Sequence, residues 1–292
     1  MNRRDFCTAI GGVGAALTLP APASAKATKF KLNYMLASSM YGKLPLNEVM
    51  GEVKKTGATH IDIWRERHAN HREQIIKMGP DGLGAIMQKH KVPIGMTTIW
   101  GKPFADELRW LKSQGGKTLV TGFIPAKSKK ITVNAYLEKI KPQLAVAEEL
   151  GITVAIENHG ATLDEIRAFA DAAKSPQLGI ALAPYHLPQD AKALAKLIED
   201  IGPKIALFYA WQHGEGAMKK LPKERELKQM PGRGDLDFTP LLAALKKVNY
   251  TGWTEIFMHP VPRGIPILPT AAETTTEINR ARSYLQQCLK RI

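Results

Sequence analysis

The feature of this sequence that most constrains its fold is a regular alternation of two kinds of segment. From residue 30 onward, short apolar segments alternate with longer segments in which apolar residues recur every three or four positions. The first pattern is typical of buried strands and the second of amphipathic helices. Strands are expected over residues 31–37, 60–64, 92–98, 118–121, 153–159, 178–182, 205–211 and 253–258. Helices are expected over 47–56, 82–90, 104–113, 132–150, from 162, and over 190–201, 238–248 and 271–289.

Eight strand–helix pairs in one chain predict an α/β fold, the single-domain (β/α)8 or TIM barrel. An open doubly wound sheet is the alternative, and it requires a glycine-rich phosphate-binding turn after the first strand. Residues 37–41 read Ala-Ser-Ser-Met-Tyr and do not supply that turn. The sequence therefore favours the barrel, whose active site lies at the carboxyl ends of its strands.

The first 25 residues have the features of an export signal. Arg3 and Arg4 form a twin-arginine pair, an apolar run follows over residues 7–19, and Ala-Ser-Ala at 23–25 suits a cleavage site. The alternative is an internal helix with a chance arginine pair. We expect a twin-arginine signal peptide over 1–25 and a barrel of 267 residues (292 − 25) over 26–292. The protein would then be periplasmic or otherwise exported.

Charge and cysteine content limit the classes of partner and of metal site that the protein could have. The formal net charge is +14, but the lysines are scattered along amphipathic segments, as a solvated basic surface would place them. Export also argues against nucleic acid as a partner. After removal of the signal only Cys288 remains, which excludes an internal disulfide and a zinc site built on several cysteines. No run is long enough to span a membrane, and the sequence leaves open whether the chain forms a homo-oligomer.

Titratable side chains collect where the expected strands end. The fifth strand runs into Glu157, Asn158 and His159, and the eighth contains Glu255. An ionised glutamate in an apolar strand is costly unless it is paired or bound to a metal. Six of the eight histidines fall at or just beyond strand ends, namely His68, His71, His159, His186, His213 and His259. These side chains predict a functional site at the carboxyl rim of the barrel.

The residue types indicate the chemistry. Imidazole and carboxylate ligands without thiolates suit Mn²⁺, Co²⁺, Mg²⁺ or Zn²⁺. We expect Glu157 and Glu255 to converge across the barrel mouth on either side of such a metal. The metal would polarise substrate oxygens, one glutamate would remove a proton next to a carbonyl, and the other would return it. Rim aromatics, including Trp64, Trp100 and Tyr209, suit the apolar face of a sugar ring, with packing alone as the alternative.

Four motifs resemble the xylose isomerase-like TIM barrel superfamily. They are Glu-Asn-His at 157–159, Pro-Tyr-His-Leu at 184–187, Gly-Arg-Gly-Asp-Leu-Asp-Phe at 232–238 and Gly-Trp-Thr-Glu-Ile at 252–256. The resemblance covers nearly all of residues 30–290. The superfamily includes sugar isomerases, ketose 3-epimerases, inosose dehydratases and endonuclease IV.

The resemblance implies a metal held by Glu, Asp, His and Glu from strands five to eight, with the two glutamates as acid and base. Ala183 and Tyr209 stand where the Asp and the His are expected. The predicted metal ligands are Glu157, His186, His213 and Glu255, of which Glu157 and Glu255 are also catalytic. The predicted substrate-binding residues are Trp64, His68, Trp100, His159, Tyr209, Gln212 and Arg233.

The expected function is metal-assisted proton transfer next to a carbonyl of a sugar or sugar derivative, by an isomerase or epimerase. A lyase or hydrolase that acts on keto-glycosides through the same proton abstraction is one alternative. A non-catalytic carbohydrate-binding barrel is another, favoured by Ala183 and Tyr209. A DNA-repair nuclease would need an Asp-x-x-His pair where residues 183–186 begin with alanine.

Overall fold

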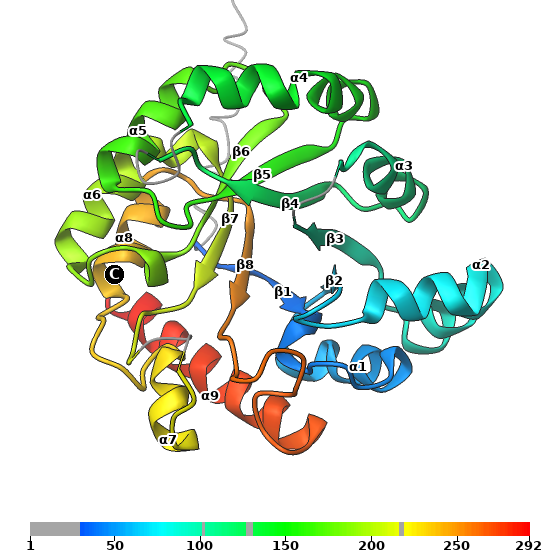
Figure 1. The fold of residues 1–292 in the computed structure, drawn as a ribbon. Coiled ribbons are helices and arrows are strands. Elements are labelled where there is room, and N and C mark those ends of the chain that lie inside the picture. The colour runs from blue at the N-terminus through cyan, green and yellow to red at the C-terminus, as the bar shows by residue number, and fades with distance from the viewer. Residues whose placement is uncertain (1–29, 101–102, 127–130, 216–218) are drawn as a thin grey trace, which may run out of the picture. The chain divides into compact units, whose positions relative to one another are not determined.

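Eight parallel strands close into a barrel in which each strand pairs with its neighbours in sequence, and β8 pairs with β1. The computed structural model describes residues 30–100, 103–126, 131–215 and 219–292. The predicted signal peptide lies outside these residues. The strands are β1 (Asn33–Ala37), β2 (His60–Trp64), β3 (Ile94–Ile99), β4 (Thr118–Phe123), β5 (Thr153–Glu157), β6 (Leu178–Leu182), β7 (Ile205–Ala210) and β8 (Trp253–Ile256). Figure 1 shows the barrel along its axis.

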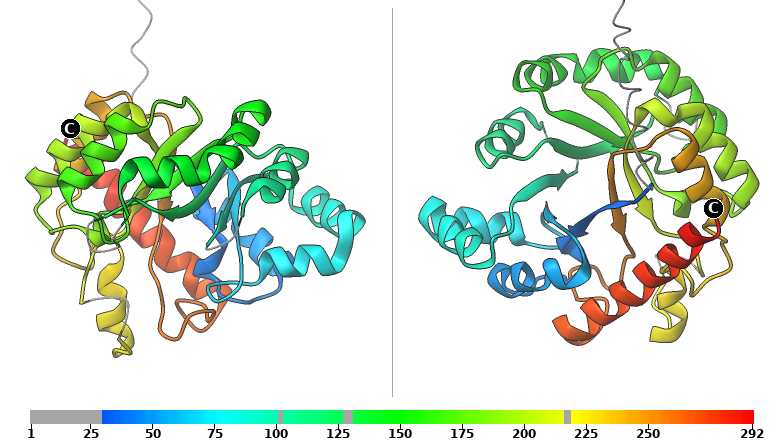
Figure 2. Two further views of the ribbon diagram at one scale, coloured as in Figure 1. Left: turned by 45° about the horizontal axis from the view of Figure 1, so that its top comes forward. Right: turned by 180° about the vertical axis from the view of Figure 1, so that it is seen from behind.

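Helices follow the strands and form an outer ring around the barrel (Figures 1 and 2). They are α1 (Leu46–Glu52), α2 (His71–His90), α3 (Ala105–Ser113), α4 (Val133–Leu150), α5 (Leu163–Ala172), α6 (Ala191–Ile201), α7 (Lys223–Glu226), α8 (Thr239–Lys247) and α9 (Ala271–Lys290). The predicted TIM barrel is confirmed. Among the described residues, no helix combines the length and the apolarity that a membrane span requires.

Most element boundaries lie within a few residues of those expected from the sequence. Helix α5 begins as expected, because Thr162 and Glu165 form a reciprocal capping box. Helix α2 begins at His71 rather than at 82, and Gly79 interrupts it with a φ of 74°. The helical pattern was weak before that kink, since Gly79 and Pro80 both disfavour a helix interior. The segment between β7 and α8 contains the short helix α7, which stands out from the barrel in Figure 2.

Two layers of side chains fill the barrel at its carboxyl end. Successive strand residues point to opposite faces, so residues two apart point the same way. Asp62, Thr98, Tyr209 and Glu255 form a lower, polar layer, in which the Thr98 hydroxyl donates to Asp62 at 2.7 Å. Two residues further along the same strands lie Trp64, Trp100, Trp211 and Phe257, which form an upper, aromatic layer. The ring of Phe257 packs against Trp64 at 5.3 Å and against Trp211 at 5.1 Å.

Candidate functional site

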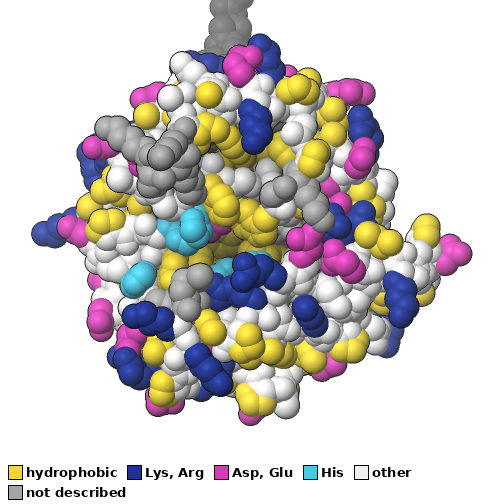
Figure 3. All heavy atoms as spheres, in the orientation of Figure 1, with side chains coloured by type: hydrophobic (Ala, Val, Ile, Leu, Met, Phe, Trp, Pro, Cys, Tyr) yellow, Lys and Arg dark blue, Asp and Glu magenta, His cyan; other side chains and the backbone are white. Residues whose placement is uncertain are grey.

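A cavity of about 470 Å³ opens at the carboxyl end of the barrel, above the aromatic layer. Figure 3 shows it as a central hollow with an apolar floor, histidines on its walls and a group of Lys and Arg side chains at its edge. Loops after β2, β3, β5, β6, β7 and β8 contribute its wall. The lining residues are Arg65, Glu66, Arg67, His68, Trp100, Phe123, Glu157, His159, Tyr185, His186, Trp211, His259 and Arg263.

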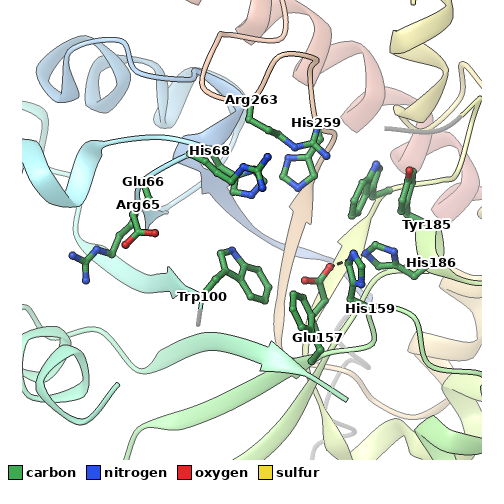
Figure 4. Close-up of a pocket in the computed structure, with 13 residues that line it drawn as sticks. Arg65, Glu66, His68, Trp100, Glu157, His159, Tyr185, His186, His259 and Arg263 are labelled. Atoms are coloured by element: carbon green, nitrogen blue, oxygen red, sulfur yellow. Dashed lines mark hydrogen bonds and ion pairs between the residues drawn. The ribbon is translucent and has the colours of Figure 1, made fainter. Parts of the chain in front are cut away.

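Glu157 and His186 form a hydrogen-bonded pair on one wall of this cavity. The Nε2 nitrogen of His186 lies 3.0 Å from Oε1 of Glu157, and both side chains are mostly buried. Glu157 ends β5, and His186 lies in a short 3-10 turn that follows β6. The ring of His159 lies 4.3 Å from that of His186, and Figure 4 shows the three side chains together. A carboxylate beside two imidazoles is a suitable arrangement for proton transfer.

The buried side chain of Asn158 holds this pair in place. Its Oδ1 accepts from the backbone N–H of Ala183 at 2.6 Å, and its Nδ2 donates to the carbonyl of Ala183 at 3.1 Å. The same carbonyl accepts from the N–H of His186 at 3.2 Å. The amide therefore ties the end of β5 to the turn that carries His186.

Aromatic rings line the cavity between its charged groups. Tyr185 and Trp211 stack at 3.8 Å with 7° between their planes, and Trp100 stacks on Phe123 at 5.1 Å. Such surfaces bind the apolar faces of ring-shaped ligands, while the polar groups fix their orientation.

Two imidazoles and two guanidinium groups lie on the opposite wall, after β2 and β8. The rings of His68 and His259 lie 4.4 Å apart. Burial, with the charges of Arg263 and Arg67, lowers the pKa of His68 to about 4. Burial is also the main cause that lowers the pKa of His259 well below its ordinary value. Both imidazoles are therefore neutral near pH 7 and can donate or accept a hydrogen bond.

Glu255 is not brought into the cavity, contrary to the expectation that it converges there with Glu157. Its side chain is completely buried in the polar layer, and neither carboxyl oxygen has a hydrogen-bond partner among the described residues. Burial, followed by the charge of Asp62, raises the pKa of Glu255 well above its ordinary value. Phe257 lies two residues further along the chain and closes the barrel above Glu255. The alternation of side chains along a strand does not reveal this closure.

The predicted metal ligands do not come together. Among the described residues, no three His, Cys, Asp or Glu side chains converge closely enough to hold a metal ion. Ala183 offers no donor, and burial raises the pKa of Tyr209 well above its ordinary value, so that its hydroxyl stays protonated. His213 is exposed, and its Nδ1 lies 3.3 Å from the carbonyl of Tyr185. Only Glu157 and His186 remain in contact, and this donor set does not fit the expected metal.

Some of the remaining predicted residues line the cavity, and the others lie beneath it or away from it. His68, Trp100 and His159 line the cavity, whereas Trp64 and Tyr209 lie beneath it. Gln212 is a structural residue, because its amide donates to the carbonyl of Met230 at 2.6 Å and accepts from the N–H of Leu236 at 3.0 Å. Arg233 lies away from the cavity, where its guanidinium binds both carboxyl oxygens of Glu277 at 2.7 and 2.6 Å.

Eight cavity residues were not among the predicted site residues. They are Arg65, Glu66, Arg67, Phe123, Tyr185, Trp211, His259 and Arg263. Arg67 stands directly before His68 after a strand end, so its position carried the same signal as the histidine. Arg263 follows a proline-rich loop without any periodic pattern, and no local signal in the sequence marks it.

Comparison with known proteins gives one family and a set of similar folds. The sequence model of the family described as xylose isomerase-like TIM barrel matches residues 50–284. No curated protein matches the chain in sequence.

Solved structures with the same fold include the following three. A protein described as IOLI, solved with a zinc atom, has a TM-score of 0.66 and 16% identity, over 89% of this chain and 99% of that chain. A D-psicose 3-epimerase from Clostridium cellulolyticum H10, solved with D-tagatose, has a TM-score of 0.67 and 13% identity, over 88% and 99%. An L-ribulose 3-epimerase has a TM-score of 0.66 and 12% identity, over 89% and 95%.

Proposed function

Because the chain belongs to the xylose isomerase-like TIM barrel family, we propose that it is an enzyme that moves a proton next to a carbonyl of a sugar or sugar derivative. Sugar epimerases among the proteins of similar fold support this class of reaction. The observation that carries the proposal is the Glu157–His186 pair, 3.0 Å apart on the wall of an aromatic cavity.

The arrangement suits a single base. Glu157 takes the proton from the carbon next to the carbonyl, while the Nε2–H of His186 keeps a hydrogen bond to the carboxyl group. The carbonyl oxygen becomes the oxygen of an enediolate and accepts a hydrogen bond from the imidazole of His159, whose ring lies 4.3 Å from that of His186. The same imidazole passes the hydroxyl proton from the neighbouring oxygen to this one, and return of the carbon-bound proton by Glu157 to the former carbonyl carbon completes an isomerisation. Because Glu255 lies outside the cavity, this route is favoured over epimerisation by two glutamates on opposite faces.

Solvent exchange tests the proposal. The purified protein is incubated in D₂O with a panel of aldoses, ketoses and keto-sugars, and NMR follows deuterium incorporation next to the carbonyl. Glu157→Gln is expected to slow exchange by about 10²–10⁴-fold, the usual contribution of a general base. His186→Asn is expected to slow it less, since it removes the partner and not the base. His90→Asn is the matched control, because His90 lies at the end of α2 and bonds Asn47. Exchange that persists in Glu157→Gln would contradict the assignment.

A second cavity favours one alternative reaction. It measures about 430 Å³, shares His159, Tyr185 and His186 with the first, and continues toward Gln189 and His213. A keto-glycoside would place its sugar in the first cavity and its aglycone in the second. Proton abstraction by Glu157 would then expel the aglycone. Release of nitrophenol from a nitrophenyl 3-keto-glucoside by the wild type, and not by Glu157→Gln, would support this lyase or hydrolase reaction over isomerisation.

Two further expectations remain proposals. Dependence on Mn²⁺, Co²⁺, Mg²⁺ or Zn²⁺ is decided by elemental analysis of the purified protein and by the shift in Tm on adding each ion. If proton exchange and ligand binding are both absent with every ion, the non-catalytic alternative gains support. Export through a twin-arginine signal is tested by sequencing the amino terminus of the secreted protein, which is expected to begin at Lys26.

A further inference from the structure

We propose that the cavity contains a subsite for an anionic group of the substrate, formed by Arg67, His68, His259 and Arg263 on the wall opposite Glu157. The inference rests on the proposed function, because it specifies the substrate class of the same cavity. It assigns a binding role to Arg67 and Arg263, which the proton transfer itself does not use.

The fold brings these four residues together from two loops. Arg67 and His68 follow β2, whereas His259 and Arg263 follow β8. Both strands pair with β1, so their loops are neighbours on the rim. The imidazole rings lie 4.4 Å apart, and Nη1 of Arg263 donates to the carbonyl of Pro260 at 2.8 Å, which orients its guanidinium. Figure 4 shows Arg263 reaching toward His68 and His259, across the cavity from Glu157.

The charge of this wall belongs to Arg67 and Arg263 and not to Arg65. The guanidinium of Arg65 is neutralised by Glu73 at 3.1 Å and by Glu107 at 3.6 Å, and Figure 4 shows it pointing away from the cavity. Burial, with the charge of Arg67, lowers the pKa of Arg263. An anion placed between two like charges relieves their mutual repulsion.

Two carboxylates lie near this charge. Glu226 bears on Arg263, but it is itself bound by Lys223 and by the backbone N–H of Val261 at 2.6 Å. Glu66 lines the rim of the same cavity. An anion between the guanidinium groups gains charge-assisted hydrogen bonds and favours protonation of the two imidazoles. A neutral sugar gains neither.

The positions of the two walls define how a substrate would lie. Strands β2 and β8 flank β1, which stands across the closed barrel from β5. An anionic substituent at Arg67 and Arg263 therefore directs the other end of a sugar toward Glu157. The chemistry fits a sugar acid whose carboxylate is remote from the reacting carbon. A phosphoryl substituent shares this chemistry.

Calorimetric titration of the full chain carrying Glu157→Gln tests the subsite, because this variant binds without the proposed turnover. The ligands are D-glucose, D-glucuronate and D-glucose 6-phosphate. An anionic ligand is expected to bind about tenfold or more tightly than glucose, as one charge-assisted hydrogen bond provides. A second substitution in the same protein, Arg263→Gln, is expected to remove most of the preference for the anionic ligand over glucose, and Arg67→Gln is expected to remove part of it. Arg263→Lys keeps the charge and is expected to retain it. Arg109→Gln, at an exposed arginine of α3, is the matched control.

The outcomes distinguish a carboxylate from a phosphoryl ligand, and they test the subsite separately from the proton-transfer reaction. Preference for glucuronate identifies a carboxylate, and preference for glucose 6-phosphate identifies a phosphoryl group. Equal affinity for the three ligands, binding of none, or a preference unchanged in both Arg→Gln variants would overturn the subsite. If Arg263→Gln does not fold, the affinities measured with Arg67→Gln test the subsite, because Arg67 is exposed. Because proton exchange is a separate measurement, its failure beside an intact anion preference would reject the reaction and not the subsite.

Discussion

The effect of replacing Asn158 on stability can be predicted quantitatively, because its amide connects the end of β5, which carries Glu157, to the turn that carries His186. In Asn158→Ala the buried N–H of Ala183 loses its partner, which costs about 1–3 kcal/mol. The carbonyl of Ala183 loses one of two bonds but keeps the N–H of His186, and this loss costs about 0.5–1.5 kcal/mol. Together these losses predict that the free energy of unfolding falls by about 1.5–4.5 kcal/mol.

Urea unfolding measures this change as a lower midpoint with an unchanged slope. Asn33→Ala is the matched control, because the Asn33 amide makes one exposed bond, to the carbonyl of Thr251 at 2.9 Å, and should cost less than about 1 kcal/mol. Proton exchange in Asn158→Ala should also slow, since the turn that carries His186 is no longer held. If Asn158→Ala proves as stable as Asn33→Ala, the tie contributes nothing and the reasoning is refuted.

Three further predictions follow from the buried ionisable groups. Burial raises the pKa of Asp62 to about 7, so the folded state holds this proton more tightly than the unfolded state. Stability conferred by the protonated carboxyl is lost as pH rises from about 4 to about 7, at up to about 1.4 kcal/mol per pH unit. Asp62→Asn should reduce that slope in urea titrations across this range, leaving the part that Glu255 contributes, and an unchanged slope would contradict it. Glu107→Ala should lower the free energy of unfolding by about 3–5 kcal/mol, because the mostly buried Arg72 loses its partner at 3.0 Å; a loss below about 1 kcal/mol would argue against this. NMR should find His68 neutral above about pH 5, since its pKa is lowered to about 4, and Arg263→Gln should raise that pKa.

The barrel itself was predictable because its signals are local and repeated. His60–Trp64 and Leu178–Leu182 were expected at the boundaries that the structure shows, since each is a short apolar run. The carboxyl rim followed from the same count, and it placed Glu157, His159 and His186 correctly beside one cavity. Such residues are found from sequence because the direction of every parallel strand is known once the fold is known.

Depth along the barrel axis was not predictable in the same way. Glu255 and Phe257 point to the same side of one strand, but only packing shows that aromatic rings close above the carboxyl group. Arg233 appeared available to a ligand, yet α9 supplies Glu277 to bind it. Arg263 reached the cavity through a loop without a pattern. In each case the deciding contact joins residues far apart in sequence, which periodicity does not report.

The aromatic layer gives the protein an optical reporter of its own. Two of the five tryptophans, Trp100 and Trp211, line the cavity, while Trp64 is sealed in the layer beneath it. A sugar that displaces water from the first two changes their emission, whether or not it is ever converted. Unlabelled protein can therefore be screened against ligand collections by intrinsic fluorescence, before any reaction product has been identified.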